Sequence, residues 1–304
     1  MKNGFTVTVP VYNMGKFLDR TLSNLVSQKE SVDNFKIIVV DDCSSDNSIE
    51  VVRRYSDKLD IDILELKDRT GTGEARNKAL KMCKTEFVGF LDADDLMNLG
   101  VADECITKMK ETGCDFGQCS AYKYNIRDNK IMGKKSFGEV LDILGETVID
   151  VNSCMDSLFE YISSNCWAKI CRVEHLRKNS IVFPDCKYGE DTAFSLKFAI
   201  HSNKIYWLDK PLITYNHPYF NGNSNDRKSV DTWKDLFIVL TDVLKEIMRI
   251  DDKEKRNKLL DSLVLSAIDD IEYTYRNISE RDKYIYKEVT GDFMLQLSQS
   301  RLEK

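Results

Sequence analysis

Short apolar runs alternate with amphipathic stretches over the first third of the chain. The runs contain β-branched and aromatic residues, have the length of strands, and lie at Phe5–Pro10, Phe35–Val40, Ile61–Leu66 and Phe87–Leu91. Between them, apolar residues recur with the spacing of one helix face. This β-α-β-α-β-α-β order predicts an α/β fold with a parallel, doubly wound sheet covered by helices on both faces.

The pattern is less regular after residue 98. It predicts a helix over Val151–Ser163, a strand over Cys166–Cys171, and two short strands at Ile205–Leu208 and Leu212–Tyr215. A further helix is expected over Asp191–His201. These elements would complete the α/β domain.

The last quarter of the chain has a different character. Residues 217–226 are rich in Pro, Gly and Asn, as is typical of a loop, and three long helical patterns follow. We therefore predict an α/β domain at 1–225 and a C-terminal helical region at 226–304. The apolar stripes of these helices are typical of helix packing, and the interface of a homo-oligomer is the alternative.

Charge and hydropathy limit the class of partner. The net charge is −6 and the pI about 5.3, which argues against a nucleic-acid-binding protein. No apolar run approaches the roughly 18 residues that span a bilayer, and the first residues lack the apolar core of a signal peptide. We therefore expect a cytoplasmic protein, with peripheral association at the inner membrane face as an option.

An acidic cluster follows the fourth predicted strand. Asp92, Asp94 and Asp95 come directly after the run FVGFL, at the carboxyl end of a parallel strand, where such sheets bind ligands. Three carboxylates this close together repel one another, and a hard divalent cation is their natural partner. A solvated acidic turn that caps the next helix is the alternative.

The other predicted strand ends bring polar groups to the same edge of the sheet. Pro10 and Tyr12 follow the first strand, and Asp42 follows the second. Arg76 comes after the glycine-bearing loop TGTGE that follows the third. Tyr12 is suited to stacking on a base, Asp42 to accepting from a base N–H, and Arg76 to pairing with phosphate. With the acidic cluster, these residues predict a nucleotide pocket.

Each of these residues also has an alternative interpretation. Tyr12 would be an amphipathic surface residue, and Asp42 would only hold backbone N–H groups in a turn. Arg76 would pair with Glu74 on a helix surface. The shared position at one sheet edge favours ligand binding over these separate explanations.

Five motifs, taken in order, resemble a known enzyme family. They are TVPVYN, VVDDCSSD, GEARNKAL, FLDADD and YGEDTAF, within residues 4–217. In this combination the chain resembles the family 2 glycosyltransferases of the A-type fold, a large inverting class. It looks similar to bacterial members that decorate cell-surface polymers such as wall teichoic acid or capsule.

The resemblance implies a donor site at the acidic edge of the sheet. Pro10 and Tyr12 match positions that flank the base of the donor, and Asp42 matches the carboxylate that binds uracil. Arg76 matches the basic residue near the uracil and the diphosphate. The implied donor is a UDP-sugar.

The resemblance also implies a divalent cation, Mn²⁺ or Mg²⁺, at the DxD motif. Asp92 matches the residue nearer the ribose, Asp94 matches the metal ligand, and Asp95 would contribute through water or the sugar. His217 lies in a loop from which a residue of this fold class often completes the metal shell. A turn histidine beside Pro218 without a role is the alternative.

The YGEDTAF motif carries the expected catalytic base. Asp191 matches the base of the family, and Glu190 is its neighbour. A carboxylate at a helix N-terminus is held ionised by the helix dipole and can take the proton of an attacking hydroxyl. A helix N-cap without a catalytic role is the alternative for Asp191.

Together these features predict a metal-dependent inverting glycosyltransferase, of the hexosyl or N-acetylhexosaminyl type, acting on a hydroxyl of a glycan or polyol-phosphate polymer. A nucleotidyltransferase acting on sugar phosphates is an alternative, but it needs a glycine-rich basic loop where this chain has VYNMGKF. A non-catalytic nucleotide-sugar-binding protein is the other. One departure is Arg69, where relatives often have Asn, so no contact is carried over to it.

Overall fold

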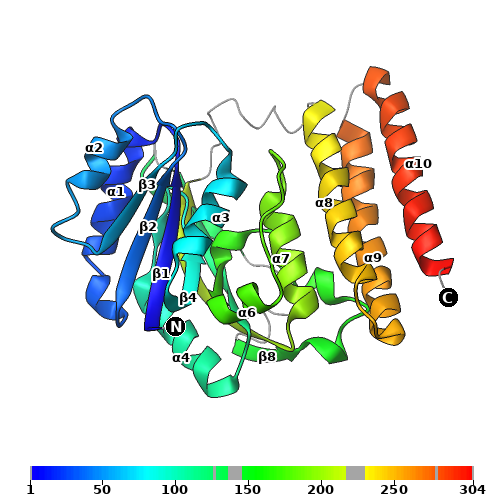
Figure 1. Ribbon diagram of the computed structural model, residues 1–304, viewed down its shortest axis with the longest axis horizontal. Coiled ribbons are helices and arrows are strands. Elements are labelled where there is room, and N and C mark those ends of the chain that lie inside the picture. The colour runs from blue at the N-terminus through cyan, green and yellow to red at the C-terminus, as the bar shows by residue number, and fades with distance from the viewer. Residues whose placement is uncertain (1, 126–127, 136–145, 217–229, 278–279, 303–304) are drawn as a thin grey trace.

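One mixed β-sheet forms the centre of the molecule (Figure 1). The computed structural model describes residues 2–125, 128–135, 146–216, 230–277 and 280–302. The strand order is β3-β2-β1-β4-β9-β6-β10-β5, with β7 paired to β6 and β8 paired to β10. The strands are β1 (Lys2–Val11), β2 (Phe35–Asp41), β3 (Ile61–Glu65), β4 (Thr85–Phe90), β5 (Leu96–Met97), β6 (Phe116–Asn125), β7 (Lys130–Lys135), β8 (Glu146–Asp150), β9 (Lys169–Arg172) and β10 (Lys204–Asn216).

The first half of the sheet is parallel, as the sequence predicts. β1 pairs in parallel with β2 on one side and β4 on the other, and β2 pairs in parallel with β3. Val7 and Val9 of β1 are fully buried, and so are Thr6 and Thr8 on the opposite face, so this strand is covered on both sides. The order places the carboxyl ends of β1, β2 and β4 close together.

The second half of the sheet is mixed, and here the predictions need correction. β9 runs antiparallel to β4 and β6, and only part of the predicted strand Cys166–Cys171 belongs to it, because Cys166–Ala168 form a 3₁₀ turn. The two short strands predicted around Pro211 are one strand, β10, whose register with β6 shifts on either side of Pro211. Proline lacks a backbone N–H and so interrupts the ladder without ending the strand.

Helices cover both faces of the sheet. α1 and α2 lie on one face, and α3, α6 and α7 lie on the other (Figure 1). α7 begins one residue before the predicted start. The helices are α1 (Gly15–Val26), α2 (Ser48–Arg53), α3 (Thr72–Met82), α4 (Leu99–Thr112), α6 (Val173–Lys178), α7 (Glu190–His201), α8 (Val230–Met248), α9 (Lys253–Asn277) and α10 (Glu280–Leu302).

The helix predicted over Val151–Ser163 is wrong. The chain there forms two separate 3₁₀ turns, Val151–Ser153 and Leu158–Glu160. The apolar side chains that suggested a helix are buried, but polar side chains take some of the backbone hydrogen bonds that a helix would use. The amide of Phe159, for example, donates to the hydroxyl of Ser262 in α9 at 2.9 Å.

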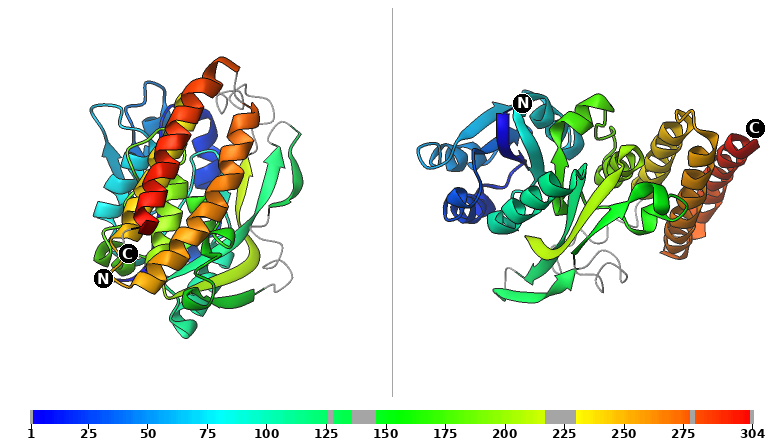
Figure 2. Two further views of the ribbon diagram at one scale, coloured as in Figure 1. Left: turned by 90° about the vertical axis from the view of Figure 1, so that its right-hand side faces the viewer. Right: turned by 90° about the horizontal axis from the view of Figure 1, so that it is seen from below.

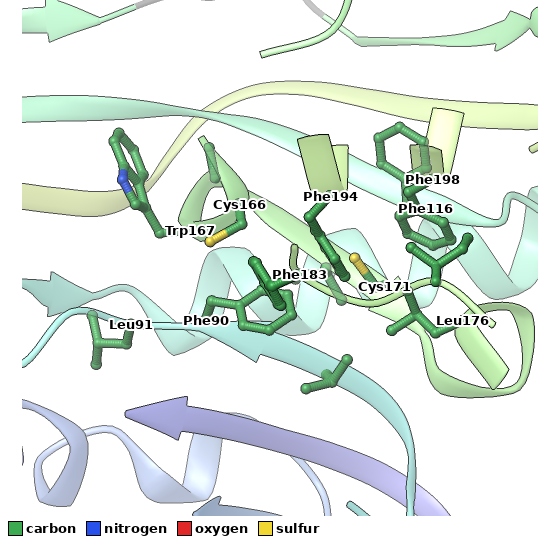
Figure 3. Close-up of a cluster of buried hydrophobic side chains, with 14 of the residues drawn as sticks. Phe90, Leu91, Phe116, Cys166, Trp167, Cys171, Leu176, Phe183, Phe194 and Phe198 are labelled. Carbon is green, nitrogen blue, oxygen red and sulfur yellow. The ribbon is translucent and has the colours of Figure 1, made fainter. Parts of the chain in front are cut away.

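Aromatic packing joins β4 to α7 beneath the carboxyl edge of the sheet (Figure 3). Phe183 stacks on Phe194 of α7, with ring centroids 4.1 Å apart. Phe90 of β4 meets both rings nearly at right angles, with centroid distances of 5.3 Å. All three rings are buried, and such contacts add stability beyond burial alone. The start of α7 is therefore fixed relative to the end of β4.

The helices α8, α9 and α10 pack together beside α7, at the end of the molecule away from β1, β2 and β3 (Figure 2). They occupy the described part of the region in which the sequence predicts long helices. The predicted boundary near residue 225 lies outside the described residues, and so does His217. Across the described ranges, no helix combines the length and apolar character needed to cross a bilayer.

Candidate functional site

A cavity of about 400 Å³ opens at the carboxyl edge of the parallel strands. Its walls come from the ends of β1, β2 and β4, from the loop after β3, and from the first turns of α3 and α7. This size is typical of small-molecule sites. The cavity brings together most of the residues that the sequence singles out, namely Pro10, Tyr12, Asp42, Arg76, Asp92, Asp94, Glu190 and Asp191.

Asp42 holds the loop after β3 against the end of β2. One oxygen of its buried carboxylate accepts from the amide and the hydroxyl of Thr70, at 2.6 and 3.0 Å. The other accepts from the amide of Gly71 at 2.8 Å. A carboxylate has about four acceptor positions, so one remains on the second oxygen. Asp42 therefore accepts hydrogen bonds from backbone N–H groups of a turn, as its alternative interpretation supposed. It can also accept one further hydrogen bond from a ligand.

Tyr12 and Arg69 form a stacked pair at the wall of the cavity. The guanidinium carbon of Arg69 lies 3.8 Å from the centroid of the Tyr12 ring, and both residues line the cavity. The Tyr12 side chain is 36% exposed, so its ring is accessible to a ligand. From the sequence no contact was carried over to Arg69, and only the structure shows that its guanidinium lies against Tyr12.

Arg76 is buried between two carboxylates and is not a surface residue. Its two terminal nitrogens donate to Asp92 at 2.8 Å and to Glu190 at 2.9 Å, and its side chain is only 4% exposed. The proposed surface pair with Glu74 is wrong, because Glu74 pairs with Lys78 one turn further along α3. Arg76 thus ties the acidic end of β4 to the start of α7.

Two neighbours of Arg76 on α3 position the same region: Gly73, which belongs to the glycine-bearing loop noted in the sequence, and Asn77, which was missed from the sequence. A side chain at Gly73 would begin 3.2 Å from Glu190 and from the carbonyl oxygen of Pro184, so a larger residue here would require these neighbours to shift by a few tenths of an ångström. The amide group of Asn77 donates to the carbonyl of Phe183 and accepts from its N–H, both at 2.9 Å. These contacts fix the segment that leads into α7.

The three carboxylates of the acidic cluster have different surroundings: two line the cavity, and the third binds the backbone of a neighbouring strand. Asp92 and Asp94 line the cavity, whereas Asp95 accepts from the amide of Asn216 at the end of β10, at 2.7 Å. Burial and the neighbouring Asp92 raise the pKa of Asp94. Burial and the charges of Asp92 and Asp94 raise the pKa of Asp95 well above its usual value. Added positive charge at Asp94 would relieve this repulsion.

These carboxylates fit a hard divalent cation in charge, but they do not enclose one. The described residues contain no cluster of three or more His, Cys, Asp or Glu side chains that could hold a metal ion. Asp94, with Asp92 beside it, would therefore supply a minority of the ligands, which is usual where substrate phosphates and water complete an octahedral Mg²⁺ shell. His217, the other predicted ligand, lies outside the described residues.

The first turn of α7 presents Glu190 and Asp191 to the cavity. Gly189 occupies the N-cap position with φ +80°, so the N-cap interpretation of Asp191 is wrong. Asp191 is the second residue of the helix, and its carboxylate accepts from the amide of Thr192 at 2.9 Å. At this position the free N–H groups and the helix dipole favour a negative charge.

The two carboxyl groups differ from ordinary ones in proton affinity. Burial and the adjacent Asp191 raise the pKa of Glu190 to about 7. Burial also raises the pKa of Asp191, although the charges of Arg76 and Lys169 oppose this. Lys169 is fully buried, burial lowers its pKa to about 8, and its ammonium donates to the carbonyls of Ser163 and Asn165 at 2.5 and 2.9 Å. Lys169 does not line the cavity, but its charge acts on Asp191, and it was not singled out from the sequence.

Comparison with known protein sequences is consistent with this geometry. The family model described as Glycosyl transferase family 2 matches residues 6–187. TarS of Staphylococcus aureus, a poly(ribitol-phosphate) β-N-acetylglucosaminyltransferase, is 30% identical over 66% of this chain, and the match spans only 33% of TarS. TarP of the same species, also a poly(ribitol-phosphate) β-N-acetylglucosaminyltransferase, is 27% identical over 84% of this chain and 76% of its own.

Solved structures extend the match to nearly the whole chain. A crystal structure of TarS residues 1–349 with UDP-GlcNAc superposes with a TM-score of 0.75 at 25% identity, covering 96% of this chain and 80% of that one. A Pyrobaculum calidifontis mannosyltransferase with GDP-mannose and Mn²⁺ shares the fold at 16% identity, with a TM-score of 0.56 and 99% and 85% coverage. The predicted A-type fold is confirmed. The chain belongs to glycosyl transferase family 2.

Proposed function

We propose that the protein transfers a sugar from a UDP-sugar to a hydroxyl of a cell-surface glycan or polyol-phosphate polymer, with inversion at the anomeric carbon. One observation carries the proposal. A single cavity combines an exposed aromatic ring beside Asp42, an acidic pair at Asp92 and Asp94, and a carboxylate at a helix N-terminus, Asp191. The similarity to TarS and TarP, both poly(ribitol-phosphate) β-N-acetylglucosaminyltransferases, supports an N-acetylhexosaminyl donor and a polymer acceptor.

The base of the donor binds at the β1 and β2 end of the cavity. The free acceptor position on Asp42 receives the N–H of uracil, and the ring lies against the Tyr12–Arg69 pair. The diphosphate then extends towards Asp92 and Asp94. A Mn²⁺ or Mg²⁺ ion held by Asp94 with Asp92, together with diphosphate oxygens, would neutralise the leaving group when bound.

Asp191 acts as the general base. The acceptor oxygen forms a bond to the anomeric carbon while the bond from that carbon to the diphosphate oxygen breaks, and the hydroxyl proton passes to Asp191. A single displacement of this kind inverts the configuration. The helix N-terminus and the positive charges of Arg76 and Lys169 favour the ionised form of Asp191 and oppose the effect of its burial. Such general-base help is typically worth about 10²–10⁴-fold in rate.

Nucleotide binding is the first expected outcome. UDP with Mn²⁺ should raise the melting temperature, since a ligand at about 100 times its Kd adds about 2.7 kcal/mol to the folded state. Asp94→Ala should abolish the part of the shift that needs the metal. Thermal unfolding with UDP, GDP and ADP, each with and without Mn²⁺, measures this. A protein that responds to none of them does not use a nucleotide sugar.

Arg69→Ala should weaken UDP binding about two- to fivefold, because the base loses a guanidinium held against Tyr12. Arg54→Ala is the matched control, since it removes the same charge from an exposed residue at the end of α2 that does not line the cavity. Calorimetric titration with UDP compares the two variants. Equal affinities in both would show that Arg69 does not contact the donor.

Asp191→Asn should lower turnover by about 10²–10⁴-fold while UDP binding is retained, because the amide cannot accept the hydroxyl proton. Release of UDP in the presence of an acceptor polymer measures turnover, and the thermal shift measures binding. Unchanged turnover would instead favour a different base. Absence of turnover in the parent protein with every donor and acceptor tested would favour the nucleotide-sugar-binding alternative.

The pH dependence of turnover should reflect the Glu190–Asp191 pair. Transfer needs an ionised Asp191, so kcat rises with pH, and because the pKa of Asp191 is raised, this rise should lie above the range of ordinary carboxyl groups. Glu190→Gln removes the adjacent negative charge and should move the rise to lower pH. Profiles of kcat between about pH 5 and pH 8.5 test this. A rise at the same pH in both proteins would show that the two groups are not coupled.

A further inference from the structure

The C-terminal helix α8 contacts the turn that leads into Glu190 and Asp191. One carboxylate oxygen of Asp235, near the start of α8, accepts from the backbone amides of Lys187 and Tyr188, at 3.1 and 2.9 Å. Two successive N–H groups converging on one charged oxygen make a strong, directional contact. The turn on which the proposed base depends is therefore held by a residue far away in sequence.

A second contact comes from the same face of α8. Val239 lies one helical turn after Asp235, and its methyl group is 3.2 Å from the position that a Cβ at Gly189 would occupy. Gly189 has φ +80°, a conformation that L-residues rarely adopt. Asp235 and Val239 thus confine residues 187–189, and α7 begins at the next residue.

Further along, two polar pairs bind α8 to the rest of α7. The ammonium of Lys197 lies 2.6 Å from Asp242, and the ring of His201 lies 2.8 Å from Glu246. Figure 1 shows α8 running alongside α7. The contact at residues 187–189 is therefore one end of a docked helix pair and not an isolated crossing.

We propose that Asp235 is a positioning residue for the transfer reaction: it fixes the 187–189 turn so that Asp191 faces the acceptor hydroxyl. The inference rests on the proposed role of Asp191 as base. Asp235 does not line the cavity, and it acts only through the backbone of the turn. The helix α8 is thereby part of the catalytic unit.

The expected effect of losing this contact falls on turnover. Asp235→Ala should lower kcat about 10- to 100-fold, because misplacement of a reacting group by about 1 Å can cost that much. Affinity for UDP should stay within about twofold, because the base end of the cavity lies on β1, β2 and the loop after β3. Asp235→Asn should recover most of the activity, since its amide oxygen can accept from both backbone N–H groups.

Asp242→Ala is the matched control. It removes a carboxylate from the same helix and breaks a contact with α7, but it leaves the 187–189 turn untouched. All variants are compared at a temperature at which circular dichroism shows them folded, with kcat and UDP affinity measured separately. An equal loss of kcat in Asp242→Ala would overturn the proposal in favour of general docking. An Asn variant as impaired as the Ala variant would also overturn it.

Hydrogen exchange gives a readout that does not depend on turnover. The amides of Lys187 and Tyr188 should exchange faster in Asp235→Ala than in the parent protein or in Asp242→Ala. Unchanged exchange would mean that Asp235 does not hold the turn. Failure of the proposed function is separate from these outcomes, because it would appear as Asp191-independent turnover, or no turnover, in the parent protein itself.

Discussion

The site depends on the buried guanidinium of Arg76. A full positive charge at this depth is tolerated only with close negative partners, and it has them in Asp92 and Glu190. Those partners come from the end of β4 and the start of α7, which lie almost a hundred residues apart. One charge network therefore sets the separation between the acidic pair and the proposed base, which is the distance that a transfer reaction needs to control.

The same network leaves the cavity with more negative than positive charge. Burial and mutual repulsion raise the pKa of Asp94 and of Glu190, so the carboxylates are held in a state that costs stability. Such destabilising arrangements are found at functional sites, where a bound ligand can offset them. In the proposed reaction, a divalent cation bound with the diphosphate would reduce the repulsion between these carboxylates. The buried charge of Lys169 favours the ionised form of Asp191.

Residues of the GEARN motif position neighbouring segments of the site more than they contact a ligand. Gly73 allows α3 to approach Glu190, Arg76 joins two carboxylates, and Asn77 holds the backbone of Phe183. The C-terminal helix α8 supports the same region from the other side through Asp235. The segment that leads into α7 is thus held by contacts from an early helix, α3, and a late one, α8.

Local patterns in the sequence determined the α/β class, the parallel half of the sheet and the strand ends that carry Asp42, Asp92 and Asp94. These features depend on which faces of a strand or helix are apolar, and neighbouring residues encode that directly. Only the tertiary structure decided that Arg76 pairs with Glu190 and that β9 runs antiparallel to β4. It also decided that residues 151–163, despite their helical spacing of apolar side chains, form 3₁₀ turns. Such outcomes depend on which distant segments meet, because buried charges and backbone groups must find partners wherever the fold supplies them.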